Sequence, residues 1–548
     1  MLLLILLAVS GCPPAGKQNG TSGQQTTGQT PPAPAAQPGG AIALPLELAV
    51  DDPRVKALDF SDHHLFALAR CIGLPLVRST PDGTLLPGLA SAWEMSADAL
   101  TWSFTDNTPP DAPPAAMPPG GQVSLWVKHL EALLRGPDTP LRAQAADLIA
   151  GAADFRDGKA LDISGVRLNI NTLTVTLTRP NRVFGLWLSQ PGLALVIDAS
   201  LPTAGYGPFR IDHQEGNTLV LKPNAASLVG QPLLRELRFV CQPDRAQQLA
   251  MFRAGQLDAA NLSPVDAATA QYDTQLADAL TVQQTAASVV GFFDLHEFPW
   301  GEGQFQSKVG LRQAANWGLD REYLGTSQNG QLAPWPHFLP QAFQRYIDPQ
   351  YVQQPPYPLH PEIEKARAGL KLADHDQGIK LPQGMDVMYL HGEYLDSLAE
   401  NIVQYLAEIS IKMRPFDASP QDLAKRLDIQ TNEIILARLY PAYPDVDALF
   451  YPALHSSLYG RGGNWALLKD AAVDKALADG QALADAQARE LNYRKLGADM
   501  EARALALFVG YSTPTLLINP QLAGYTLTPY DYDASLPAQD FAQLGLAK

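Results

Sequence analysis

Residues 81–104, PDGTLLPGLASAWEMSADALTWSF, carry the strongest indication of the fold in this sequence. The opening Pro-Asp-Gly is a turn signal, because proline presets its own φ and glycine adopts conformations that other residues avoid. The stretch closes on Trp102 and Phe104, which alternate with polar residues as a half-buried strand requires. An apolar segment precedes the turn, so we predict a strand, a turn and a further strand.

Helical and extended patterns alternate on both sides of this stretch. Four segments have the spacing of an amphipathic helix, with apolar residues recurring every three or four positions. Two segments alternate around a turn and predict hairpins, and two apolar runs predict single strands. This alternation of helices and strands predicts the α/β class. The helices are expected at 123–134, 243–260, 307–325 and 397–410, the hairpins at 166–180 (turn 171–172) and 206–224 (turn 215–217), and the strands at 234–242 and 432–440.

The first forty residues predict an export signal, a lipid anchor and a spacer. Residues 2–9 form an apolar run that is too short to span a bilayer but suits the core of a signal peptide. The run leads into Val-Ser-Gly-Cys, which resembles a bacterial lipobox, so 1–12 is the expected signal peptide and lipobox, with Cys12 lipidated. Residues 13–42 are mostly Pro, Gly, Gln, Thr, Ser and Ala, a composition typical of a disordered tether. No Lys or Arg precedes the apolar run, and a buried N-terminal helix with an incidental cysteine is the alternative.

The composition is that of an acidic protein with several domains. At 548 residues, the chain has room for about three to four domains. Its 40 Lys and Arg against 56 Asp and Glu give a formal net charge of −16, which argues against nucleic acid or an anionic membrane surface as a partner. Beyond residue 12, no apolar run approaches the roughly 18 residues that a membrane helix needs. The body is therefore expected to be soluble and to meet a membrane through its lipid alone.

Two cysteines, Cys71 and Cys241, lie in the predicted folded body. In an oxidising compartment they can form a disulfide, but the sequence does not show whether they are close together. Two separate buried thiols are the favoured interpretation.

The sequence contains no motif that predicts catalysis or a cofactor. G-x-S-x-G, H-E-x-x-H and C-x-x-C are missing, and the Gly-Lys pair at 158–159 lacks the spacing of a phosphate-binding loop. His63-His64 is the one pair of adjacent histidines. Because neighbours on a helix point apart, we expect a solvated or capping role for this pair rather than metal binding. The chain is therefore predicted to be no enzyme and to hold no cofactor or metal.

Five segments in register resemble one protein family, the family 5 bacterial extracellular solute-binding proteins, which are the oligopeptide-binding components of ABC importers. Residues 82–104 resemble the family pattern D-G-x-x-x-P-G-L-A-x-S-W, and residues 309–324 resemble V-R-x-A-x-x-x-A-I-D-R-x-x-L. Each motif alone is weak, but together they span about residues 43–530. The other matching segments are GYGPFRI at 205–211, the helix at 243–260, AGYT at 523–526 and, for the peptide-binding branch, 152–180.

The resemblance implies a two-lobed α/β fold of the periplasmic-binding-protein type, class II, in its large form with an inserted extra domain. Such a protein closes about a hinge, because a ligand that touches both lobes favours the closed form. It is expected as a monomer that works outside the cytoplasm with ABC permease subunits. The implied units are lobe I at 43–74, 200–288 and 512–548, inserted domain II at 75–199, and lobe III at 289–511.

The resemblance leaves alternatives open for the role and the ligand. The favoured role is a lipid-anchored receptor that delivers a small solute, foremost a peptide or peptide-like compound, to an ABC importer. A sensory or scaffold lipoprotein with the same fold is the first alternative. Transport of a non-peptide ligand, such as a sugar or a metal complex, is the second.

The ligand region that the resemblance implies lies around residues 432–457. Peptide-binding relatives carry an Asp there that binds the free ammonium group of the peptide, since a buried ammonium without a carboxylate is costly. Aligned on Tyr443, this sequence has Ala442 in place of that Asp and Leu439 in place of a Trp. This departure puts recognition of a free amino terminus in doubt.

A set of side chains around this region are candidate ligand contacts. Two acids can replace the missing carboxylate, although Asp445 equally suits a cap for the helix expected at 446–454. The tyrosines can wall a pocket or pack in the core, and Arg438 can meet a ligand carboxylate or point to solvent. Asn464 matches a family Asn beside the cleft. The full set is Arg438, Tyr440, Tyr443, Asp445, Asp447, Asn464 and Tyr511.

Overall fold

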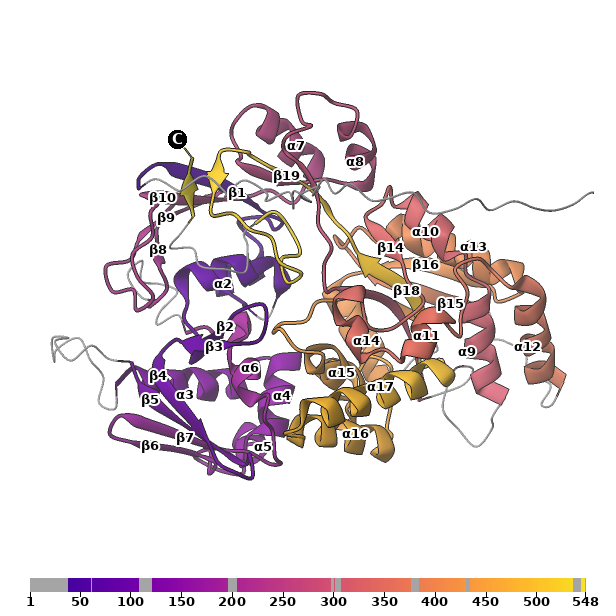
Figure 1. Ribbon diagram of the computed structural model, residues 1–548, viewed down its shortest axis with the longest axis horizontal. Coiled ribbons are helices and arrows are strands. Elements are labelled where there is room, and N and C mark those ends of the chain that lie inside the picture. The colour runs from indigo at the N-terminus through magenta and orange to yellow at the C-terminus, as the bar shows by residue number, and fades with distance from the viewer. Residues whose placement is uncertain are drawn as a thin grey trace, which may run out of the picture.

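Three units, each built on its own sheet, make up the protein (Figure 1). We call them lobe I (upper left in Figure 1), domain II (lower left) and lobe III (right). Cys12 and residues 13–37 of the predicted tether lie outside the described residues, and the first strand begins at Ala41. The computed structural model describes residues 38–60, 62–107, 121–195, 205–296, 300, 307–375, 384–429, 434–535 and 544–547.

Lobe I joins three distant parts of the chain. Its main sheet has the order β1-β10-β9-β8, with β1 parallel to β10 and the other pairs antiparallel. A smaller sheet places β19, from near the C-terminus, between β11 and β12. The predicted hairpin at 206–224 is β8-β9, and Gly216 in its turn has a φ of 58°. The elements are β1 (Ala41–Leu46), α1 (Pro53–Ala57), η1 (His63–Leu65), α2 (Phe66–Ile72), β8 (Phe209–Glu215), β9 (Thr218–Pro223), β10 (Glu236–Cys241), α7 (Arg245–Arg253), β11 (Ala259–Asn261), α8 (Pro264–Ala270), β12 (Leu280–Val282), β19 (Thr515–Ile518), β20 (Leu522–Ala523) and β21 (Gly545–Leu546).

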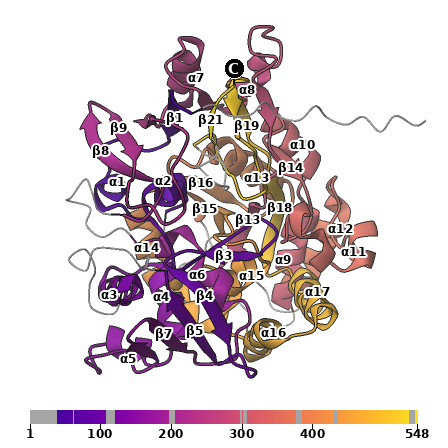
Figure 2. The same ribbon diagram turned by 60° about the vertical axis from the view of Figure 1, so that its left-hand side comes forward.

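Domain II contains residues 81–104 and comes forward in Figure 2. The predicted turn lies between β2 and β3, and the predicted strand is β5, whose Trp102 and Phe104 are buried in the core of the domain. The hairpin at 166–180 is β6-β7, but its turn is 170–171, one residue earlier than predicted. The elements are β2 (Val77–Ser79), β3 (Leu85–Pro87), β4 (Ala90–Met95), β5 (Thr101–Asp106), α3 (Gly121–Arg135), α4 (Pro140–Leu148), α5 (Ala152–Arg156), β6 (Val166–Asn169), β7 (Thr172–Thr176), α6 (Phe184–Leu188) and η3 (Pro191–Leu193).

Lobe III is built on a six-stranded mixed sheet with the order β14-β18-β13-β17-β15-β16. The prediction of one helix at 307–325 is wrong, because the structure has two, α9 and α10. Gly318 disfavours a continuous helix, and Asp320 caps α10 by accepting from the backbone N–H of Tyr323 at 2.9 Å. The elements are β13 (Ser288–Phe293), α9 (Ser307–Trp317), α10 (Arg321–Ser327), β14 (Leu332–Pro334), η4 (Gln341–Tyr346), α11 (Pro349–Gln353), α12 (Ile363–His375), β15 (Met385–Leu390), α13 (Asp396–Glu408), β16 (Met413–Ala418), α14 (Pro420–Ile429), β17 (Ile434–Leu439), α15 (Asp447–Leu454), η5 (Ser456–Leu458), η6 (Gly460–Gly462), α16 (Ala471–Ala482), α17 (Ala486–Ala502) and β18 (Ala506–Ser512).

The other predicted elements are confirmed as α3, α7, α13, β10 and β17. Helix α7 is shorter than the segment 243–260, because Gly255 follows it with a φ of 69° and the last residues of the segment belong to β11. The residue boundaries between the units stay a prediction.

Two arginines of the α9–α10 segment are fully buried in lobe III. Arg321 donates hydrogen bonds to the backbone oxygens of Phe508 (2.7 Å), Asn316 (3.0 Å) and Pro358 (2.7 Å). Arg312 donates in the same way to backbone oxygens that follow α17. Burial lowers the pKa of Arg321 to about 9. These guanidinium groups bind the helices to the end of α17 and to β18.

Lobe I and lobe III are joined by two adjacent crossings of the chain, from β12 to β13 and from β18 to β19. The crossings are hydrogen-bonded to each other, with Ser512 N donating to Ala287 O at 2.9 Å and Thr285 Oγ1 donating to Ser512 O at 2.7 Å. Few residues therefore need to change φ and ψ for the two lobes to rotate relative to each other, which is the structure of a hinge.

Cys71 and Cys241 are buried and free, so the favoured prediction of two separate thiols is confirmed. Burial raises the pKa of Cys241 to about 12 and that of Cys71 well above its usual value. Neither thiol is positioned or ionised for reaction at neutral pH.

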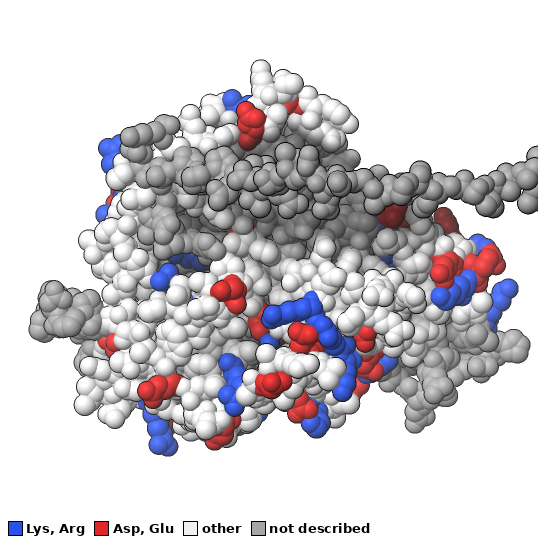
Figure 3. Space-filling model, viewed as in Figure 1, with Lys and Arg blue, Asp and Glu red and all other residues white. Residues whose placement is uncertain are grey.

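Charged side chains of both signs lie side by side on the described part of the face in Figure 3. This mixture of charges differs from the basic patch that a polyanion requires. Among the described helices, none combines the length and the apolar character that crossing a membrane would need.

Candidate functional site

A cavity of about 820 Å³ lies where the three units meet. Lobe I lines it with residues between 47 and 66, domain II with residues between 140 and 192, and lobe III with residues between 390 and 465. Its volume falls in the range of roughly 300–1,000 Å³ that small-molecule sites occupy. Part of the wall is apolar, with Phe60, Phe66, Leu141, Leu449 and Trp465 on it.

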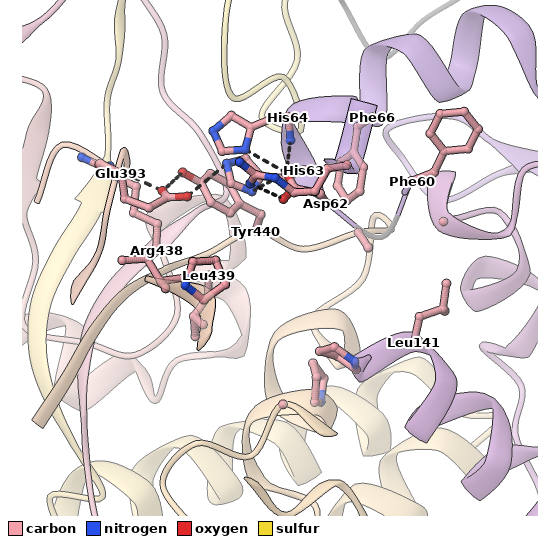
Figure 4. A pocket seen from close by; sticks show the side chains of 18 of the residues that line it. Phe60, Asp62, His63, His64, Phe66, Leu141, Glu393, Arg438, Leu439 and Tyr440 are labelled. Atoms are coloured by element: carbon pink, nitrogen blue, oxygen red, sulfur yellow. Dashed lines mark hydrogen bonds and ion pairs between the residues drawn. The ribbon is translucent and has the colours of Figure 1, made fainter. Parts of the chain in front are cut away.

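The polar part of the wall is a direct contact between lobe I and lobe III (Figure 4). The ring of His63 stacks on that of Tyr440, with centroids 3.9 Å apart and planes 16° from parallel. Nε2 of His63 lies 3.6 Å from Oε1 of Glu393, and the Tyr440 hydroxyl donates to Oε2 of Glu393 at 3.2 Å. The end of β17 and the loop after β15 thus meet η1 beside the cavity.

Asp62 holds the two adjacent histidines in place. Its Oδ1 atom accepts from the backbone N–H of His64 at 3.0 Å and contacts Nδ1 of the same residue at 2.8 Å, while Arg54 donates to its Oδ2 atom at 2.8 Å. The two imidazole centroids are 3.9 Å apart, and the side chains of His63 and His64 are only 18% and 11% exposed. The predicted solvated or capping role of the histidines is therefore wrong. Asp62 is the cap, and the tight 3₁₀ turn brings the rings together.

Burial and neighbouring charges set the protonation of this cluster. Burial, reinforced by His64, lowers the pKa of His63 to about 4, so its ring is neutral at neutral pH. Burial also opposes charge on His64, but the hydrogen bond to Asp62 outweighs it and raises the pKa of His64 to about 9. For Glu393, burial favours the neutral acid, yet His63, His64 and Arg438 lower its pKa overall. The cluster therefore combines a neutral His63 with an ionised His64, which is paired with Asp62, and an ionised Glu393.

Three of the predicted ligand contacts line the cavity: Arg438, Tyr440 and Tyr443. Arg438 is 14% exposed and donates to the backbone oxygen of Glu393, so its side chain lies along the wall and does not extend into solvent. The Tyr443 hydroxyl donates to Oδ2 of Asp447 at 3.1 Å. Ala442 and Leu439, at the positions of the missing Asp and Trp, also line the cavity.

Asp445 and Asp447 lie behind this wall, outside the residues that line the cavity. Oδ1 of Asp445 accepts from the backbone N–H of Asp447 at 2.8 Å, which is the capping alternative considered for it, and pairs with Arg489 at 2.6 Å. Asp447 is buried and accepts from the hydroxyls of Tyr443 and Tyr493. Burial, with Asp445 nearby, raises the pKa of Asp447. Reaching a ligand would require these acids to leave their present partners.

Asn464 and Tyr511 are also set apart from the cavity lining. Asn464 is fully buried and donates to the backbone oxygen of Leu468 at 2.8 Å, so it stabilises the turn after α15. Tyr511 packs in β18 and donates its hydroxyl to Oε1 of Gln341 at 2.7 Å. These contacts hold both residues in the fold, and ligand contact by either one stays a prediction.

Sequence reasoning missed the charged residues of the cavity wall, chiefly Glu47, Asp62 and Glu393. Glu47 follows directly on β1, and Glu393 lies just after β15. An acid at the carboxyl end of a buried strand is a usable signal, because such ends gather at ligand sites in α/β folds. For Asp62, the signal is its place as the residue before a short helix.

Domain II and lobe III touch through a contact that we call the interlobe clasp, formed by Asp147 and Arg179 of domain II with Tyr451 and Gln481 of lobe III. Arg179 Nη2 lies 2.6 Å from Asp147 Oδ2, and the Tyr451 hydroxyl donates to the same oxygen. Nε of Arg179 donates to Gln481 Oε1 at 3.3 Å. In Figure 1 this contact, near α4 and α16, is in the lower half, whereas the crossings near β19 are in the upper half.

These features define a class: an α/β protein of two hinged lobes with an inserted domain, which encloses a ligand between them. A model described as "Bacterial extracellular solute-binding proteins, family 5 Middle" matches residues 130–460. The chain belongs to this family, whose members work outside the cytoplasm.

Relatives of this chain are peptide-binding proteins by name. "Probable di/tripeptide-binding protein 5" of Pseudomonas aeruginosa (strain UCBPP-PA14) is 24% identical over 498 residues, which are 85% of this chain and 88% of that protein. The murein tripeptide binding protein MppA of Escherichia coli has a TM-score of 0.72 at 18% identity, over 94% of this chain and 100% of that one. OppA of Haemophilus influenzae in complex with RPPGFSPFR has a TM-score of 0.71, with the same identity and coverage. These two structures show that the fold is shared.

Proposed function

We propose that this protein captures a small solute, foremost a peptide or peptide-like compound, in the 820 Å³ cavity and delivers it to an ABC permease. The observation that carries the proposal is the place of the cavity, between lobes that are joined by a two-crossing hinge. A ligand that contacts both lobes favours the closed form, and the closed form presents a different surface to a permease. The role requires binding and release, with no chemical step.

The wall of the cavity favours a ligand without a free α-ammonium group. Ala442 lines the cavity where peptide-binding relatives present an Asp. Three of the wall carboxylates already have a guanidinium partner: Glu47 pairs with Arg245 at 2.6 Å, Asp62 with Arg54 at 2.8 Å, and Glu393 lies 3.9 Å from Nη1 of Arg438. Two further wall carboxylates, Asp417 and Asp422, contact His391 and Ser419. A free ammonium group would have to compete with these guanidinium groups for the carboxylates. We therefore propose a blocked or modified peptide, a cell-wall fragment or a non-peptide solute as the cargo.

Free and N-acetylated forms of the same tri- to pentapeptides are expected to bind with affinities within tenfold of each other, a difference of at most about 1.4 kcal/mol. The reason is the missing carboxylate at Ala442. Isothermal titration calorimetry on the wild-type chain measures both forms, with Asp445→Asn and Asp447→Asn measured beside it.

A free peptide that binds more than tenfold tighter would contradict this expectation, and loss of that preference in one Asn variant would identify the carboxylate. If no peptide binds but sugars or metal chelates raise the melting temperature, the ligand is not a peptide, and the proposal that the protein captures a small solute is retained. A ligand at a concentration of 100 times its Kd adds about 2.7 kcal/mol to the free energy of unfolding, which a thermal-shift measurement detects. If no class of solute shifts the melting temperature or compacts the chain in X-ray scattering, the scaffold role replaces capture.

We further propose that Cys12 carries a lipid and that residues 13–37 hold the folded body away from the membrane. The motif Val-Ser-Gly-Cys and the Pro- and Gly-rich composition behind it support this. Cys12→Ala is expected to move the protein from the membrane fraction to the soluble fraction of fractionated cells. A variant that stays as membrane-bound as the wild type would overturn the anchor. Cys71→Ala, which changes a buried thiol, is the control and should leave the distribution unchanged.

A further inference from the structure

Three side chains that can ligate a metal converge on the cavity wall from one short segment: Asp62, His63 and His64. One ligand atom from each lies within 4.8 Å of the others. Asp62 Oδ1 is 2.8 Å from His64 Nδ1 and 3.9 Å from His63 Nδ1. In a tetrahedral zinc site with bonds of about 2.1 Å, neighbouring donor atoms are about 3.4 Å apart. The two separations from Asp62 Oδ1 thus differ from this value by about 0.6 Å and 0.5 Å, and the two imidazole donors lie within 4.8 Å of each other.

The neighbours of this cluster are arranged as supports for metal ligands. With Nδ1 of His63 turned to the cluster, its Nε2 atom faces Oε1 of Glu393 at 3.6 Å, where a carboxylate fixes the ring orientation and strengthens the ligand. Stacking on Tyr440 holds the plane of the same ring. Arg54 donates to Oδ2 of Asp62, and the backbone N–H of His64 holds Oδ1 on the side of the two rings, where its second lone pair can meet an ion. The set thus has both donor atoms and a surrounding shell that positions them.

We propose that Asp62, His63 and His64 form a binding site for a divalent first-row transition-metal ion, such as Zn²⁺ or Ni²⁺. Two imidazole nitrogens with one carboxylate oxygen suit these ions, whereas Mg²⁺ and Ca²⁺ prefer oxygen ligands alone. The ion displaces the proton that lies between His64 Nδ1 and Asp62 Oδ1. Because all three residues line the cavity, the remaining coordination position faces the space for the solute. That a solute amine or carboxylate fills this position rests on the proposed function, whereas ion binding itself does not.

The test is a titration of the full-length, chelator-treated chain with Zn²⁺ and with Ni²⁺, without any solute. The titration uses the Cys12→Ala chain, so that the thiol of Cys12 does not compete for the ion. We expect one ion per chain with a dissociation constant in the micromolar range or tighter. His63→Ala and His64→Ala should each weaken binding at least tenfold, and Glu393→Gln by about tenfold, as loss of an orienting carboxylate does. His213→Ala, which changes an exposed histidine 3.1 Å from Asp212, is the matched control and should change nothing.

A second measurement needs no variant and guards against misfolding of the alanine proteins. X-ray absorption at the metal edge of the wild-type chain loaded with one equivalent of Zn²⁺ should show two imidazole ligands with bonds of about 2.0–2.1 Å. Binding weaker than millimolar, equal affinity in the His63 and His64 variants, or a spectrum without imidazole scattering would each overturn the proposal. None of these results bears on solute capture, which is measured in metal-free protein.

Discussion

Replacing Arg321 by methionine is expected to lower the free energy of unfolding by at least about 4 kcal/mol, or to give a chain that does not fold. The guanidinium is fully buried and serves the backbone oxygens of Phe508, Asn316 and Pro358. Methionine fills much of the volume but leaves these oxygens without a donor, at about 1–3 kcal/mol each. Urea denaturation followed by tryptophan fluorescence measures the loss.

Arg367→Met is the matched control for this experiment. Arg367 is 48% exposed and pairs with Glu364 at 3.1 Å, so its replacement should change the free energy of unfolding by no more than about 0.5 kcal/mol. Arg321→Lys separates charge from geometry, because lysine keeps the charge but cannot reach several backbone oxygens with one planar group. A loss below about 1 kcal/mol for Arg321→Met would show that water or rearranged backbone satisfies the oxygens.

The second large effect is expected at the interlobe clasp. Tyr451→Phe removes the hydroxyl that donates to Asp147, an ionised acceptor whose pKa Arg179 and Tyr451 lower against the effect of burial. A hydrogen bond to a charged group contributes about 1.5–3 kcal/mol, so the ratio of closed to open molecules should fall by roughly 10- to 100-fold. Single-molecule fluorescence transfer measures this ratio directly.

The structure offers positions for the two dyes in this experiment. Leu161 of domain II is 96% exposed and Leu491 of lobe III is 50% exposed, and cysteines placed there in a Cys12→Ala chain are far more accessible than the buried Cys71 and Cys241. Tyr525→Phe is the control, because its hydroxyl donates within lobe I to Ala534 at 3.2 Å. The Tyr525→Phe change should lower the free energy of unfolding and leave the ratio of closed to open molecules unchanged. A Tyr451→Phe ratio equal to that of the wild type would show that the clasp persists in the open form.

Helices, strands and turns could be predicted from the sequence where the turn residues and the spacing of the apolar residues indicated the same element. The Pro-Asp-Gly turn and the strand with Trp102 and Phe104 are where the pattern indicates. The prediction of one helix at 307–325 was wrong because the apolar residues keep their helical spacing through Gly318 and Asp320. The side chain of Asp320 caps a new helix, α10, and this cap decides where the second helix begins.

The cavity wall could not be predicted in the same way, because it is made by tertiary contact. His63 and Tyr440 stack on each other although they are 377 positions apart in the sequence (440 − 63 = 377). The rule that adjacent histidines point apart holds for a regular α-helix, and η1 is a tight turn in which it fails. The family resemblance correctly indicated Arg438, Tyr440 and Tyr443 as neighbours of the cavity, but it carried no information on Asp62 or Glu393.

The place of β19 sets the order in which the protein can mature. This strand, residues 515–518, is the middle strand of its sheet, so β11 and β12 have no partner there until the last part of the chain has emerged. Domain II, by contrast, has the strands of its sheets within one continuous stretch, although Tyr451 and Leu458 of lobe III also pack into its core. During synthesis, the three-stranded sheet of lobe I therefore lacks its middle strand until more than 200 residues after β11 have been made (515 − 261 = 254). The three-stranded sheet of lobe I is therefore among the last parts of the fold that can form.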